Sequence, residues 1–156
     1  MAHSLELGAP IPHFSAVTDS GATINSATMT GTVIVLYFYP KDDTSGCTQE
    51  ACDFRDNMAR ITAKGATVIG VSPDSIKSHT KFKTKHDLSF QLISDESKDL
   101  CQSFGVWVEK SMYGRKYMGV ERSTFLIGRD GTLLKVWRKV SVPGHVSAVI
   151  EAIEAL

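Results

Sequence analysis

The sequence contains no apolar segment that approaches the ~20 residues needed to span a bilayer. Its amino terminus also lacks a basic stretch followed by an apolar one, so we expect no signal peptide. Neither sign of charge is in excess, because 17 Lys and Arg residues balance 17 Asp and Glu residues. A chain of zero net charge is poorly suited to nucleic acid or to a membrane surface, and we predict neither as a partner.

Cysteine is scarce, with three residues in 156, and the count is odd. This disfavours a structural disulfide framework and fits a reducing compartment, so the cytoplasm is the predicted location. Cys-x-x-Cys and His-x-His pairs are both missing. We therefore expect no zinc site, no other metal and no cofactor.

The chemistry of the chain centres on residues 40–52. Before them, the β-branched and aromatic run 32–39 predicts a strand buried on both faces. From Cys47 onward, apolar side chains recur at helical spacing: Cys47, Ala51, Phe54, Met58 and Ile61. This pattern predicts a helix from about 47 to 64, closed by Gly65. Cys47 then lies in the first helical turn, where free N–H groups and the helix dipole favour the nucleophilic thiolate.

Cys52 follows Cys47 by five positions. Five residues of helix rotate by ~500° and rise ~7.5 Å, which points the two sulfurs ~140° apart and separates the Cα atoms by ~8.6 Å. A disulfide needs Cα atoms closer than about 7 Å. These two cysteines can therefore form a disulfide only if the helix unwinds.

The remaining pattern predicts an α/β fold. Strand 32–39, the helix and strand 66–72 form a βαβ unit, so the two strands should be parallel. Antiparallel hairpins are expected at 14–25, around Ser20-Gly21, and at 121–137. The other expected elements are helices at about 74–86, 96–104 and 145–155, a strand at 90–93 and an exposed excursion or hairpin at 113–117. Together they predict a central mixed sheet flanked by helices, with Cys47 at the carboxyl edge of a central strand.

Residues 40–47 resemble the peroxiredoxin signature Pro-x-x-x-Thr-x-x-Cys, with Pro40, Thr44 and Cys47 at its three fixed positions. The order of elements is similar to a thioredoxin fold with an N-terminal β-hairpin extension. Arg122 resembles the arginine that this family brings to the cysteine from a neighbouring strand. The spacing of Cys52 is similar to the bacterioferritin comigratory protein (PrxQ) subfamily. The resemblance covers essentially the whole chain and implies one peroxiredoxin domain over residues 1–156.

The resemblance implies a thiol peroxidase. Cys47 would be the peroxidatic cysteine, oxidised to a sulfenic acid by hydrogen peroxide or an organic hydroperoxide. Cys52 would be the resolving cysteine, forming an intramolecular disulfide with Cys47 in an atypical 2-Cys cycle. Thioredoxin or a similar dithiol protein would be the reductant, and the subfamily is often monomeric.

Negative charge builds on the departing oxygen when a thiolate attacks a peroxide. Arg122 and the backbone N–H groups of Gly46 and Cys47 could stabilise both that oxygen and the thiolate. Gly46, which has no side chain, would also allow the backbone to approach the ligand closely.

Three other residues have possible roles in the site, and two of them also have simpler structural explanations. The hydroxyl of Thr44 can accept from the peroxide or donate to the sulfur, or it can simply cap the helix or the turn that precedes it. Pro40 has no N–H and can shield the pocket from water. Glu50 can orient Arg122 through an ion pair, although a surface glutamate in a first helical turn is common through the helix dipole alone.

Two other functions are compatible with cysteines on a thioredoxin-like fold. A thioredoxin-like disulfide oxidoreductase would need its second cysteine at the position of Glu50, so the observed spacing disfavours it. A non-enzymatic binding protein or chaperone on the same fold would use its cysteines only as a redox sensor. Consumption of peroxide with a thiol reductant separates an enzyme from that case.

Several reactive residue types have simpler interpretations. Cys101, on the short helix at 96–104, is expected to be structural. His79 and His86, seven apart on one helix, are expected to be partly exposed surface residues rather than ligands. The lysines of the same helix are expected to form a solvated face: Lys77, Lys81, Lys83 and Lys85.

Overall fold

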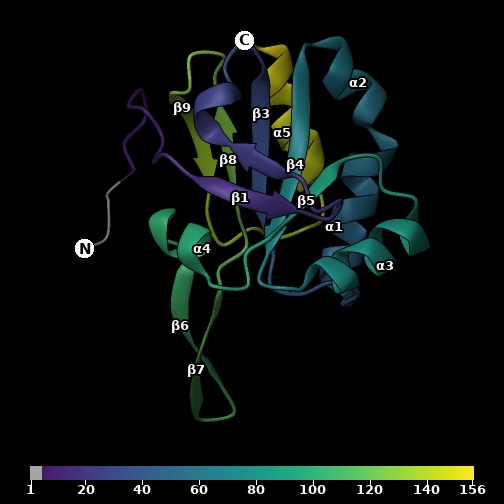
Figure 1. The fold of residues 1–156 in the computed structure, drawn as a ribbon, viewed down its shortest axis with the longest axis vertical. Coiled ribbons are helices and arrows are strands. Elements are labelled where there is room, and N and C mark those ends of the chain that lie inside the picture. The colour runs from purple at the N-terminus through teal and green to yellow at the C-terminus, as the bar shows by residue number, and fades with distance from the viewer. Residues whose placement is uncertain (1–4) are drawn as a thin grey trace.

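The computed structural model describes residues 5–156 (Figure 1). The strands are β1 (Ser15–Thr18), β2 (Thr23–Asn25), β3 (Val33–Phe38), β4 (Ala66–Ser72), β5 (Gln91–Ser94), β6 (Trp107–Met112), β7 (Arg115–Val120), β8 (Ser123–Ile127) and β9 (Leu133–Trp137). The helices are α1 (Ser45–Asp56), α2 (Met58–Ala63), α3 (Ile76–His86), α4 (Asp99–Ser103) and α5 (His145–Glu154). Among these residues, no helix combines the length and the apolar character needed to cross a bilayer.

Seven strands form one mixed sheet in the order β2-β1-β5-β4-β3-β8-β9. β3 runs parallel to β4 and antiparallel to β8, while β1 with β2 and β8 with β9 form antiparallel pairs. The predicted βαβ unit and both predicted hairpins are therefore confirmed. β6 and β7 form a separate two-stranded hairpin that projects from the body (Figure 1) and is longer than the predicted excursion at 113–117.

All six residues of β3 are buried, as predicted, because the strand separates two hydrophobic clusters. Val35 and Tyr37 face the cluster formed with α1, α2, α3 and α5. Leu36 and Phe38 face the cluster formed with α4. The sheet is thus covered on both faces, and β3 delivers its carboxyl end to the start of α1.

The prediction of one helix over 47–64 is wrong, because the segment forms two helices separated at Asn57. The side-chain amide of Asn57 donates to the backbone carbonyl of Asp53 at 2.8 Å and so competes with the helical ladder. Gly65 follows α2 with a φ of 71°, the left-handed conformation that glycine adopts readily.

The expectation that His79 lies at the surface is also wrong, since its side chain is fully buried on the inner face of α3. The rest of α3 includes exposed residues, as predicted for its lysines, but two of these lysines form ion pairs. Lys83 is half-buried and pairs with Asp19 at 3.1 Å, and Lys85 pairs with Asp43 at 2.9 Å. A buried histidine needs polar partners, and those of His79 come from the loop that precedes Cys47 and from the Ile93 carbonyl on β5.

Candidate active site

Cys47 is the third residue of α1 and is 1% exposed. The helix begins at Ser45 with Thr44 as its N-cap, and the loop 39–44 joins it to the carboxyl end of β3. Cys47 therefore lies in the first turn, as predicted, among amide groups that have no intrahelical acceptor. The positive end of the helix dipole favours an anion at this place.

Arg122 lies between β7 and β8 and reaches the same turn. One guanidinium nitrogen, Nη2, donates to the Cys47 Sγ at 3.3 Å. The other, Nη1, donates to Glu50 Oε1 at 2.7 Å. A Cβ on Gly46 would lie 3.3 Å from Arg122 Nη2, which is unusually close. The small size of Gly46 thus makes room for the guanidinium, a contact that the sequence did not indicate.

Glu50 is fully buried, so its interpretation as a surface residue is wrong. Its ion pair with Arg122 orients the guanidinium toward Cys47, while its second oxygen, Oε2, has no hydrogen-bond partner within the described structure. Burial raises the pKa of Glu50 to about 7, because the loss of solvation outweighs the attraction of Arg122. The ion pair therefore titrates near neutral pH.

The titration of Glu50 gives a testable pH dependence. Between pH 4.5, the ordinary pKa of a glutamate, and about pH 7, Glu50 keeps its proton in the folded protein but loses it in the unfolded chain. The free energy of unfolding therefore falls as the pH rises through that range. Glu50→Gln removes this pH dependence. As the pH rises through the same range, the free energy of unfolding of the variant should increase by about 3 kcal/mol relative to that of the parent. Urea unfolding at a series of pH values measures the difference. The exposed Glu154→Gln is the control, and parallel curves for Glu50→Gln and the parent would contradict the expectation.

Thr44 and Pro40 border the same turn. Thr44 is exposed and its hydroxyl donates to the Lys41 carbonyl at 3.0 Å. Thr44 is the N-cap residue of α1, but its side chain makes no capping bond to the helix. Its hydroxyl instead bonds within the preceding turn, which is the other capping alternative. With its proton used in this way, the hydroxyl oxygen is left to accept a hydrogen bond. Pro40 is half-buried at the start of the loop.

The other two cysteines differ in environment, although all three thiols are free. Cys52 is half-buried and lies on the same regular helix as Cys47, which keeps the two sulfurs apart. Cys101 is fully buried, and burial together with the nearby Asp95 raises the pKa of its thiol well above the usual range. An un-ionised, enclosed thiol is a poor nucleophile, in agreement with a structural residue.

Tyr37 lies beneath the site and was missed by sequence reasoning. Its ring contacts that of Phe54 on α1, with centroids 4.8 Å apart, and its hydroxyl is buried without a partner in the described structure. Burial, followed by the charges of Glu50 and Cys47, raises the pKa of Tyr37, which keeps it neutral. Strand alternation was the available signal, because it places Tyr37 on the α1 face of β3.

The family model AhpC/TSA matches residues 7–136. A putative peroxiredoxin Bcp from Coxiella burnetii is 46% identical over 147 residues, 94% of this chain and 97% of that protein. Peroxiredoxin Bcp from Bacillus subtilis is 47% identical over 151 residues, 97% of this chain and 96% of that protein.

Solved structures agree. Peroxiredoxin Q from Xanthomonas campestris superposes with a TM-score of 0.89 at 42% identity, covering 97% of this chain and 96% of that one. A PrxQ variant from Xylella fastidiosa gives a TM-score of 0.93 at 37% identity, covering 99% and 98%. The chain belongs to the AhpC/TSA family. Within it, the chain is a peroxiredoxin of the Bcp/PrxQ group with the thioredoxin-like fold predicted above.

Proposed function

We propose that this peroxiredoxin reduces hydrogen peroxide and organic hydroperoxides through Cys47. The observation that carries the proposal is the Arg122 guanidinium 3.3 Å from the Cys47 sulfur, in the first turn of α1. The bacterioferritin comigratory protein of Xanthomonas campestris, to which the chain is 41% identical, is described in terms of its alkyl peroxide reduction activity. That description supports organic hydroperoxides as substrates.

In the proposed oxidation, the Cys47 thiolate attacks the terminal oxygen of the hydroperoxide. An S–O bond forms, the O–O bond breaks, and the sulfur is oxidised to a sulfenic acid while an alkoxide or hydroxide leaves and takes a proton from solvent. Arg122 and the backbone N–H groups of Gly46 and Cys47 stabilise the charge on the leaving oxygen. Thr44 accepts a hydrogen bond from the peroxide O–H, and Pro40 helps to exclude water.

In the proposed resolution, the Cys52 sulfur attacks the sulfenic sulfur of Cys47, a disulfide forms and water leaves. Because both residues lie on α1, the first turns of this helix must unwind before the sulfurs meet. The interruption at Asn57 supports this step, since α1 can unwind without disturbing the α2 ladder. Thioredoxin or a similar dithiol protein then returns both thiols by exchange.

The test of this cycle is mass mapping after one equivalent of hydrogen peroxide. The parent should carry a disulfide between Cys47 and Cys52. Cys52→Ser should consume one equivalent, then stall with thioredoxin and over-oxidise at Cys47. Cys101→Ser should turn over normally as the matched control. A parent disulfide that includes Cys101, or sustained turnover by Cys52→Ser, would remove Cys52 from the resolving role.

We also propose that residues 1–156 act as one domain, as a monomer, in the cytoplasm. The monomer rests on the resemblance to the PrxQ subfamily, which is often monomeric. The three free thiols support a reducing compartment.

A further inference from the structure

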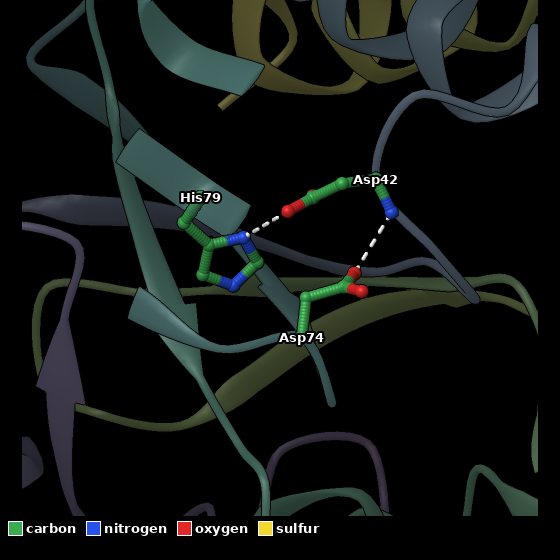
Figure 2. A group of neighbouring side chains, drawn as sticks. All are labelled: Asp42, Asp74 and His79. Atoms are coloured by element: carbon green, nitrogen blue, oxygen red, sulfur yellow. Dashed lines mark hydrogen bonds and ion pairs between the residues drawn. The ribbon is translucent and has the colours of Figure 1, made fainter. Parts of the chain in front are cut away.

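The loop before Cys47 is attached to α3 through Asp42, which is 7% exposed. The Tyr39 hydroxyl donates to Asp42 Oδ1 at 2.7 Å, and the Ser78 hydroxyl donates to Oδ2 at 2.8 Å. His79 Nδ1 lies 2.7 Å from the same Oδ2. Figure 2 shows the ring of His79 pointing toward the Asp42 side chain. One carboxylate thus collects three side-chain partners, two of them from α3.

The second ring nitrogen of His79, Nε2, lies 2.9 Å from the backbone carbonyl of Ile93. A carbonyl only accepts, so Nε2 carries a hydrogen, and the opposite nitrogen faces a carboxylate that already accepts from two hydroxyls. Burial opposes a charge on His79, but the hydrogen bond and charge of Asp42, together with Ile93 and Asp74, raise its pKa. His79 and Asp42 therefore form a buried ion pair between loop and helix.

A second tether holds the loop backbone. The Asp42 N–H donates to Asp74 Oδ2 at 2.8 Å (Figure 2), and the Ser72 hydroxyl donates to the same oxygen at 2.6 Å. Asp42, Asp74 and His79 lie close enough together to resemble a set of metal ligands. The carboxylate oxygens instead accept hydrogen bonds from N–H and O–H groups, so the three residues form a hydrogen-bonded tether. We call this set of contacts the Asp42 clamp.

We propose that His79 is a positioning residue for the oxidation of Cys47, acting through the Asp42 clamp. The inference rests on the proposed function. Asp42 lies two residues before the N-cap Thr44, so the clamp fixes the point from which α1 begins. It thereby holds the free amides of the first turn, and the hydroxyl of Thr44, in the geometry that the peroxide needs. Each time α1 unwinds for resolution, the clamped loop remains as the template on which the first turn reforms.

The test uses His79→Ala and Asp42→Asn and measures two rates by intrinsic tryptophan fluorescence. Oxidation of Cys47 by hydrogen peroxide should slow about tenfold in each variant, because the first turn is less often in place. Disulfide formation should keep its parent rate or accelerate. The double variant should match the single ones, since both residues act in one clamp. His79→Gln keeps an N–H donor toward Asp42 and should recover part of the oxidation rate.

Hydrogen exchange supplies a readout that does not depend on activity. In the reduced protein, amides 46–54 should exchange about tenfold faster in His79→Ala than in the parent, with α5 unchanged. Two controls exclude a general loss of stability. Thr80→Ala changes an exposed residue of α3, and Val149→Ala makes a cavity in the core on α5. Both should leave the ratio of the two rates at the parent value.

The proposal is overturned if both clamp variants oxidise at the parent rate. It is also overturned if oxidation and disulfide formation slow by the same factor in the clamp variants, as a general loss of stability would cause in Val149→Ala. Should His79→Ala fail to fold, Asp42→Asn and Ser78→Ala carry the same comparison, with a smaller slowing for Ser78→Ala. A parent protein that does not consume peroxide would instead contradict the proposed function. A parent that does, with unchanged clamp variants, contradicts the clamp alone.

Discussion

Cys47→Ser is expected to lower the rate of peroxide consumption by about four orders of magnitude or more, since no other group on the chain replaces the nucleophile. A serine hydroxyl at the start of α1 is a poor nucleophile toward a peroxide, even with Arg122 beside it. The measurement is consumption of hydrogen peroxide with thioredoxin and its reducing system present in excess.

Cys101→Ser is the matched control for this loss. The Cys101 thiol is fully buried beside Asp95, and its raised pKa holds it in the un-ionised form. A serine hydroxyl can take its place and still face Asp95, so Cys101→Ser should retain the parent rate. If Cys47→Ser consumed peroxide as fast as the parent, the assignment of Cys47 as the peroxidatic cysteine would be wrong.

The placement of Cys47 was predictable because it depends on neighbours in sequence. The unbroken apolar run of β3 requires cover on both faces, and the apolar spacing after it requires a helix. A cysteine at the junction must then lie in the first turn of that helix. Local rules of this kind also located both hairpins and Gly65.

The environment of Glu50 was not predictable in this way. Its burial depends on Arg122, which is 72 positions away and arrives only after the projecting β6–β7 hairpin has returned the chain to the sheet. A glutamate in a first helical turn is explained equally well by the helix dipole, so the sequence alone left both interpretations open.

His79 was misplaced for a related reason. Its partners come from the loop at Asp42 and from Ile93 on β5, and a helix rich in lysine suggests a solvated face. The predicted helix is divided at Asn57, whose side chain donates a hydrogen bond to the backbone carbonyl of Asp53. The spacing of apolar residues gives no information about such a bond. Each of these errors concerns a polar group whose partners become known only when the chain is folded.

Arg122→Met should slow the oxidation of Cys47 by about 100-fold, because it removes the charge that faces both the thiolate and the leaving oxygen. Arg122→Lys should recover only part of this loss, since one ammonium cannot reproduce the fixed fork that donates to Glu50 at 2.7 Å and to the Cys47 sulfur at 3.3 Å. Stopped-flow oxidation by hydrogen peroxide measures the rate, and the exposed Arg129→Met is the control.

Loss of Arg122 also leaves the buried Glu50 without its partner. The effect of the substitution on stability must therefore be distinguished from its effect on the oxidation rate. Arg122→Met should be destabilised most above pH 7, where Glu50 must ionise in a site that no longer compensates its charge. The double variant Arg122→Met/Glu50→Gln removes the uncompensated charge and should regain stability in urea unfolding. Its oxidation rate should stay at the level of Arg122→Met, because the missing guanidinium, and not the fold, limits the reaction. Recovery of the rate together with stability would show that Arg122 serves the structure alone.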